Sequence, residues 1–86
     1  MLATVTMFYK PSILDDEGRA ICLSLNSLGH KNIEDVRVSK QLVIKLNETN
    51  KDTAYKNVDK MCKTMLVNEV MQDYTIDITT KTNNAN

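Results

Sequence analysis

The sequence predicts an α+β fold of the ferredoxin-like kind, an α/β sandwich in which a mainly antiparallel sheet carries two helices on one face. Three observations predict this fold. A segment at each end of the chain alternates apolar and polar residues, two inner segments repeat apolar residues at helical spacing, and a long alternating segment lies between those two. With 86 residues, the chain is expected to form a single domain over residues 1–79, followed by a polar tail over residues 80–86.

The first strand is predicted over residues 3–9, where β-branched and other apolar residues alternate across the two faces of a strand. Pro11 should end its pairing, because proline has no backbone N–H and a fixed φ.

A helix is expected next, over about residues 16–28. Asp15 or Asp16 can cap its N-terminus by accepting hydrogen bonds from backbone N–H groups, and Gly29 occupies the position that commonly ends a helix. Its apolar stripe consists of Leu14, Gly18, Ile21, Leu25 and Leu28.

Even-numbered apolar residues then predict a long strand over residues 33–46, formed either as one bent strand or as two. Lys40 interrupts the apolar side of this pattern. Because burial of an unpaired ammonium group is costly, the strand should bend, break or reach an edge near Ser39 and Lys40.

A second helix is predicted from a cap at Thr49 or Asn50 to about Asn68. Its inward stripe consists of Ala54, Val58, Met61, Cys62, Met65 and Leu66. The methionines at 7, 61, 65 and 71 lie on or beside apolar stripes and are expected to fill the core. A last strand over residues 71–79 completes the pattern.

Charge and cysteine content exclude several classes of function. Eleven basic residues balance eleven acidic ones, which disfavours binding to nucleic acid or to an anionic membrane surface. Cys22 and Cys62 lack the spacing of a zinc site or a redox pair, and we expect both to be reduced thiols that pack as small apolar groups in the cytosol. A chain this short gains stability by association, so at least a homodimer is expected.

Catalytic patterns are not evident in the sequence. His30 is the single histidine and follows a helix end, where its charge would complement the helix dipole. Asp15, Asp16 and Glu17 are neighbours at a helix start, where capping explains them better than metal binding does. The two glycines form no phosphate-binding loop. The sequence therefore predicts no catalytic, cofactor or metal residues in this chain.

Three segments resemble the PurS family, the small subunits of phosphoribosylformylglycinamidine synthase. Residues 10–18 (KPSILDDEG) resemble the family's opening of the first helix, and residues 27–29 (SLG) with 35–40 (DVRVSK) resemble its turn and long strand. Residues 61–74 resemble its second helix end and last strand. The chain departs from the pattern at Asp16, Ser39 and Glu69, where the family commonly has proline, glycine and proline.

The resemblance implies a non-catalytic bridging subunit of a glutamine-dependent carbon–nitrogen ligase in de novo purine synthesis. In that family, the PurQ glutaminase subunit holds the nucleophile and the PurL synthetase subunit holds the ATP and substrate sites, while a PurS homodimer docks the two in the cytoplasm and assists ammonia transfer. ATP, Mg and glutamine would then be used by the partners, with none bound by this chain alone.

Arg37, Lys40 and Lys10 are the candidate partner contacts. Arg37 has odd parity on the predicted long strand and should point away from the core, where its planar guanidinium could bind a partner or remain solvated. A competing hypothesis is a ferredoxin-like regulatory module that senses a small molecule, since fold alone does not separate the two.

Overall fold

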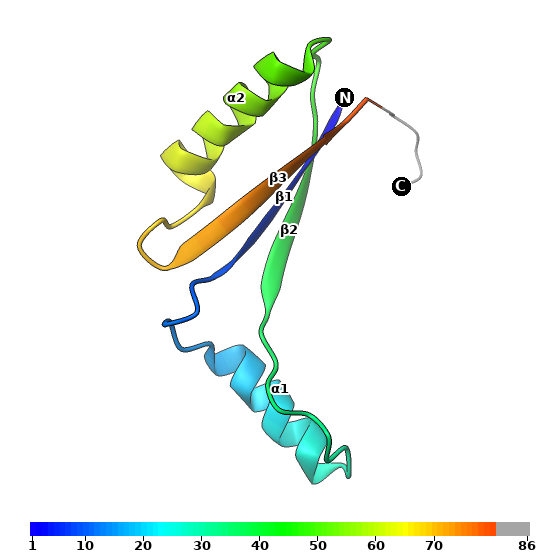
Figure 1. The fold of residues 1–86 in the computed structure, drawn as a ribbon, viewed down its shortest axis with the longest axis vertical. Helices are drawn as coiled ribbons and strands as arrows, with labels where there is room; N and C mark the ends of the chain where they lie inside the picture. The colour runs from blue at the N-terminus through cyan, green and yellow to red at the C-terminus, as the bar shows by residue number, and fades with distance from the viewer. Residues whose placement is uncertain (81–86) are drawn as a thin grey trace.

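The computed structural model describes residues 1–80, and its strands and helices follow the predicted order (Figure 1). They are β1 (Leu2–Tyr9), α1 (Asp16–Ser27), β2 (Ser39–Lys45), α2 (Lys51–Met61), η1 (Cys62–Leu66) and β3 (Gln72–Thr79). The predicted α+β class and the antiparallel sheet are confirmed. The predicted tail lies, apart from Thr80, outside the described residues. None of the helices within residues 1–80 has the length and hydropathy needed to cross a membrane.

β1 is the central strand of a three-stranded sheet with the order β2-β1-β3, and both of its neighbours run antiparallel to it. Val5 lies opposite Leu42 on one side and opposite Ile76 on the other. Since side chains alternate along a strand, this register places Val5, Leu42 and Ile76 on the same face of the sheet.

α2 covers that face and forms the core with it (Figure 1). Asn50 caps the helix by accepting a hydrogen bond from the Thr53 N–H at 2.9 Å, as predicted for one of the two candidate caps. The buried apolar residues are Ala3, Val5 and Met7 of β1, Ala54 and Val58 of α2, and Cys62, Val67 and Ile78. Ala54, Val58 and Cys62 recur every fourth residue, which places them along one side of the helix.

A π-helical turn changes the end of the second helix. The Val67 N–H donates to the Cys62 carbonyl at 3.0 Å, five residues back, so the side chains after Cys62 depart from the α-helical period. Met65 is 82% exposed and Met61 37%. The prediction that these two methionines face the core is therefore wrong. Met71 is also exposed, and Met7 alone of the four is buried.

α1 corrects the prediction of two helices on one face. It packs against none of the strands and not against α2, and it lies beyond the end of the sheet, so that the molecule measures 49 × 31 × 15 Å (Figure 1). Three residues of its predicted inward stripe are accordingly exposed, Leu14 at 65%, Ile21 at 40% and Leu28 at 76%, whereas Gly18 is buried and Leu25 half-buried. The reason is that α1 is bonded to the segment before β2, as described below, rather than to the sheet.

The long alternating segment divides where Lys40 interrupts its pattern. Its pairing with β1 begins at Ser39, and residues 33–38 precede the ladder without a strand partner in the described part of the chain. β2 is an edge strand and Lys40 is exposed on it. The predicted break near Ser39 and Lys40 is thus confirmed.

Candidate functional site

Asp15 joins the start of α1 to the chain that leads into β2. It is buried, with 4% of its surface exposed. One carboxylate oxygen accepts a hydrogen bond from the Gly18 N–H at 2.9 Å, and the other accepts one from the Val38 N–H at 2.7 Å. The Val38 and Gly18 donors hold the pKa of the Asp15 carboxyl below its ordinary value, because they bond to its ionised form. Asp15 is therefore both the predicted helix cap and a link to a segment 23 residues away.

Gly18 allows α1 to approach that segment closely. A Cβ atom at this position would lie 2.1 Å from the Val36 carbonyl oxygen and 2.8 Å from an Asp15 carboxylate oxygen. Helix backbone and extended backbone therefore meet where no side chain fits. One turn further on, the Cys22 thiol lies 4.0 Å from the Ile33 carbonyl oxygen, so the approach continues along the helix.

Arg37 fastens the loop between β1 and α1. Its guanidinium donates hydrogen bonds to the Lys10 carbonyl at 3.1 Å and to the Ile13 carbonyl at 2.9 Å. The side chain is exposed and points off the core, as its parity predicted. The structure thus gives Arg37 an intramolecular role that the sequence did not indicate, while the remaining guanidinium surface faces solvent. We call the group of Lys10, Asp15, Gly18, Val36, Arg37 and Val38 the α1 junction.

Of the two candidate lysines, Lys10 belongs to this junction and Lys40 lies on the edge strand β2. The Lys10 ammonium forms an ion pair with Asp73 at 2.6 Å, and its backbone N–H donates to the Met71 carbonyl at 2.9 Å, which fixes the end of β1 against β3. Both members of the ion pair are substantially exposed, at 36% and 49%. Lys40 lies opposite Met7 on the edge strand β2. The three candidates therefore border one end of the sheet.

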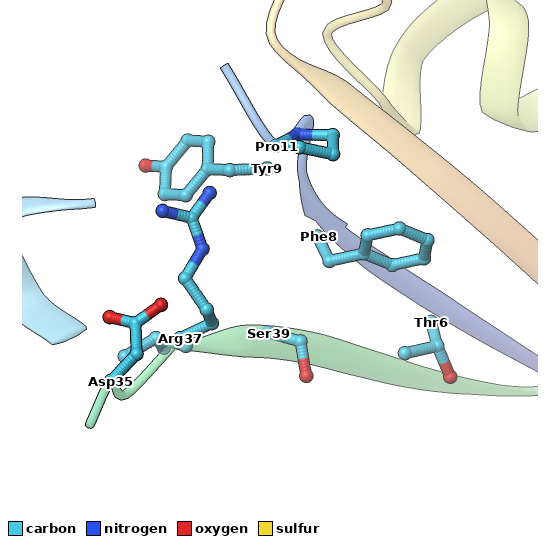
Figure 2. Close-up of a pocket in the computed structure, with 8 residues that line it drawn as sticks. Thr6, Phe8, Tyr9, Pro11, Asp35, Arg37 and Ser39 are labelled. Carbon is cyan, nitrogen blue, oxygen red and sulfur yellow. The ribbon is translucent and has the colours of Figure 1, made fainter. Parts of the chain in front are cut away.

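A pocket of about 490 Å³ opens on the face of the sheet opposite α2, beside the α1 junction. Figure 2 shows the Arg37 guanidinium pointing toward Tyr9 and Pro11, with Asp35 on its other side and Phe8 along the sheet. The lining residues are Thr6, Phe8, Tyr9, Pro11, Asp35, Arg37, Val38 and Ser39. Aromatic rings next to a guanidinium make a surface suited to contact with another protein.

A second polar cluster ties β3 to α2. The Tyr74 hydroxyl donates to the Asp59 carboxylate at 2.5 Å, and the Lys63 ammonium lies 3.1 Å from the same carboxylate. The hydrogen bond to Asp59 raises the pKa of the Tyr74 hydroxyl, and the Tyr74 and Lys63 donors lower the pKa of the Asp59 carboxyl. These groups stabilise the packing of the helix on the sheet.

The cysteines and the histidine take structural positions. Cys62 is fully buried, and burial raises the pKa of its thiol, as expected for packing rather than for a nucleophile. Cys22 is half-buried beside Ile33, and the His30 backbone N–H donates to the Leu25 carbonyl at the end of α1. Among residues 1–80, no three His, Cys, Asp or Glu side chains lie close enough to hold a metal ion.

Four members of the α1 junction were missed as site residues by sequence reasoning, namely Asp15, Gly18, Val36 and Val38. The close approach at Gly18 could have been predicted from the sequence, because glycine within a helix lowers its stability and often marks a place where another backbone segment comes close. The second bond of Asp15, to Val38, had no local signal, since the two residues are far apart in the chain.

Comparison with known proteins places these features in a family. The PurS family, described as phosphoribosylformylglycinamidine (FGAM) synthase, matches residues 2–80. A phosphoribosylformylglycinamidine synthase subunit PurS from Methanocaldococcus jannaschii is 37% identical over 76 residues, which are 88% of this chain and 92% of that relative.

Solved structures agree in fold. The crystal structure of Methanocaldococcus jannaschii PurS, one of the subunits of formylglycinamide ribonucleotide amidotransferase, has a TM-score of 0.82 at 38% identity and covers 88% of this chain and 92% of its own. A chain in the structure of PurLQS from Thermotoga maritima has a TM-score of 0.77 at 25% identity, covering 90% of this chain and 96% of its own.

Proposed function

Because the chain belongs to the PurS family, we propose that it is the small subunit of a phosphoribosylformylglycinamidine synthase and acts in purine biosynthesis. The observation that carries the proposal is the family match over residues 2–80, which includes every element of the fold. Relatives that match over most of both lengths support assignment of the whole subunit rather than of a shared fragment.

The subunit's role in this proposal is to bridge two catalytic partners. A PurQ-type glutaminase releases ammonia from glutamine, and a PurL-type synthetase uses ATP and Mg to convert formylglycinamide ribonucleotide into the amidine. This chain binds none of these reactants alone. In support, the polar groups that the fold brings together at the α1 junction are engaged in holding backbone: Asp15 binds two N–H groups and Arg37 binds two carbonyls.

Bridging has a chemical purpose. Ammonia released into water would mostly be protonated at neutral pH, and ammonium is not a nucleophile. Docking the two active sites together excludes water from the transfer and prevents this loss.

Arg37, Lys40 and Lys10 remain the proposed partner contacts. Arg37 lines the pocket beside the aromatic residues, and Lys40 is exposed on the sheet edge. Lys10 keeps its ammonium at the surface while it pairs with Asp73. A protein surface with acidic groups would complement these three cations. We also propose that the subunit acts as a homodimer in the cytoplasm.

Co-purification tests the assignment. The tagged chain, mixed with the glutaminase and the synthetase from the same source, should retain both partners in the presence of glutamine and ATP. Arg37→Glu should weaken retention by roughly tenfold or more, since a reversed charge in a desolvated contact costs over 1.4 kcal/mol. Arg19→Glu makes the same change on the exposed face of α1 and serves as the matched control.

Retention of neither partner by a folded wild-type chain would contradict the proposal. Binding of a small metabolite by the chain alone, without either partner, would favour the regulatory-module hypothesis instead.

A further inference from the structure

The pocket beside the α1 junction presents a cation, a carboxylate and two aromatic rings to one open space (Figure 2). The cation is Arg37, the carboxylate is Asp35, and the rings belong to Phe8 and Tyr9. The pocket volume of about 490 Å³ lies within the range of sites that bind small molecules. The proposed partner contacts include only Arg37 of these four residues, so the other three have no role in the proposed function.

The carboxylate of Asp35 and the guanidinium of Arg37 form no ion pair with each other in the described part of the chain. One residue separates them in an extended segment, so their Cα atoms lie about 6.6 Å apart on the same face. One Asp35 oxygen accepts a hydrogen bond from the Val36 N–H at 2.9 Å, and the other has no partner within residues 1–80. Opposite charges at this spacing suit a ligand that carries an ammonium group and a carboxylate on neighbouring atoms.

The Arg37 guanidinium is already held in place in the free chain. Its Nη2 donates to the carbonyls of Lys10 and Ile13, and its other N–H groups have no hydrogen-bond partner within residues 1–80. The two carbonyls fix its orientation but, being neutral, leave its positive charge unbalanced. Little side-chain freedom is then lost when a ligand binds, which favours binding of a carboxylate.

Phe8 is an aromatic residue on a polar face of the sheet. In the register of the strands it lies between Ser39 of β2 and Asp73 of β3. Its ring is half-buried and does not belong to the core, which lies on the opposite face under α2. Figure 2 shows this ring across the pocket from the Arg37 guanidinium, which points toward Tyr9. A flat side chain of a ligand can therefore lie against aromatic rings in this space.

From these observations we propose that the pocket binds a free α-amino acid with an aromatic side chain. The carboxylate of the ligand accepts hydrogen bonds from Arg37, its ammonium group donates to Asp35, and its ring lies against Phe8 and Tyr9. The inference goes beyond the proposed function, which assigns no ligand to this chain. Glutamine is a poorer ligand, because it has no ring to stack and its side-chain amide would lose water against the aromatic walls.

A bound amino acid would occupy the Arg37 guanidinium, which is also a proposed partner contact. Ligand and partner would then compete for one cation, and saturation of the pocket should lower retention of the partner. This consequence rests on the proposed function, whereas the binding site itself does not.

An NMR titration of the isotopically labelled full chain with L-phenylalanine tests the site. Backbone amide signals should shift at Phe8, Tyr9 and Arg37, with a dissociation constant on the order of 1 mM or lower. Three related compounds each remove one recognised group: N-acetyl-L-phenylalanine the ammonium, L-phenylalaninamide the carboxylate, and L-alanine the ring. Each should bind roughly tenfold more weakly than L-phenylalanine, or weaker still.

Asp35→Asn is the main variant, because asparagine keeps an oxygen that can accept from the Val36 N–H but carries no charge. It should raise the dissociation constant of L-phenylalanine by roughly tenfold or more, and it should abolish the preference over N-acetyl-L-phenylalanine. Asp77→Asn removes the same charge from an exposed position on the same face of the sheet and is the matched control. It should change the constant by less than about twofold. Phe8→Leu keeps an apolar side chain without the ring and should also weaken binding.

The outcomes separate the site from the proposed function. Saturable shifts at the pocket that require the ammonium group, the ring and Asp35 support the site. Absence of binding at millimolar ligand, shifts away from the pocket, or equal effects of the two asparagine variants overturn the site and leave the proposed function standing. Binding without any loss of partner retention supports the site and contradicts Arg37 as a partner contact. Retention of neither partner contradicts the proposed function, while a positive titration would still support the site.

Discussion

Gly18→Ala tests the role of the α1 junction. The added methyl group would lie 2.1 Å from the Val36 carbonyl oxygen, and because that atom belongs to the backbone, it cannot rotate away. α1 and the facing segment would have to separate by about 1 Å before the contact reached 3.0 Å. The same movement would lengthen the bonds that Asp15 accepts from Gly18 and Val38.

Two opposing terms decide the sign of the effect. Alanine is favoured over glycine within a helix by about 1 kcal/mol. Overpacking against a fixed neighbour costs about 1–3 kcal/mol, and backbone obstruction places Gly18 toward the upper end. We therefore expect Gly18→Ala to lower the free energy of unfolding by about 1–2 kcal/mol.

Urea unfolding followed by circular dichroism measures this change, at one fixed protomer concentration because association shifts the midpoint. Ser24→Ala is the matched control, since it raises helix propensity on the exposed side of α1 without a clash. If Gly18→Ala were as stable as the wild type, or stabilised like Ser24→Ala, the close approach at Val36 would be refuted.

Three further changes test the packing of the fold. Cys62→Ser should lower the free energy of unfolding by about 1–3 kcal/mol, because it buries a hydroxyl group, and should leave the activity of the assembled synthase intact. Loss of turnover in a folded variant would contradict a purely structural role. The pKa of the Tyr74 hydroxyl is raised in the folded chain, so the free energy of unfolding of the wild type should fall as the pH rises above about 10. Tyr74→Phe should reduce this fall, whereas the control Tyr55→Phe should leave it unchanged. Asp73→Asn should cost less than about 1 kcal/mol, with the difference vanishing in high salt, because its ion pair is exposed; a larger, salt-independent loss would refute this.

Local patterns in the sequence predicted the elements of the fold well. The alternation in β1 and β3 and the caps at Asp15 and Asn50 depend on neighbouring residues, and each appears where the pattern placed it. The break at Lys40 was also predictable, since it follows from the cost of burying an ammonium group.

Placement of the first helix could not be predicted from its own residues. An apolar stripe indicates that a helix face is to be covered, but it does not say by which element or by which chain. Leu14, Ile21 and Leu28 form such a stripe and are exposed in the single chain. The position of α1 is instead set by non-local contacts of Asp15 and Gly18 with residues 36–38.

The error at Met65 has a different origin. A helical period assumes a constant number of residues per turn, and the π turn between Cys62 and Val67 adds a residue. Ala54, Val58 and Cys62 follow the predicted stripe, whereas Met65 within the π-helical turn does not.

The bridging role is tested most directly by two rates measured in one reconstituted mixture. Glutaminase and synthetase are assayed for amidine formation from glutamine and, in parallel, from added ammonium, each with and without this chain. Addition of the chain should raise the glutamine-dependent rate by roughly tenfold or more and change the ammonium-dependent rate by less than about twofold. An equal rise in both rates, or no rise in the glutamine-dependent rate when all three subunits are bound together, would contradict the account.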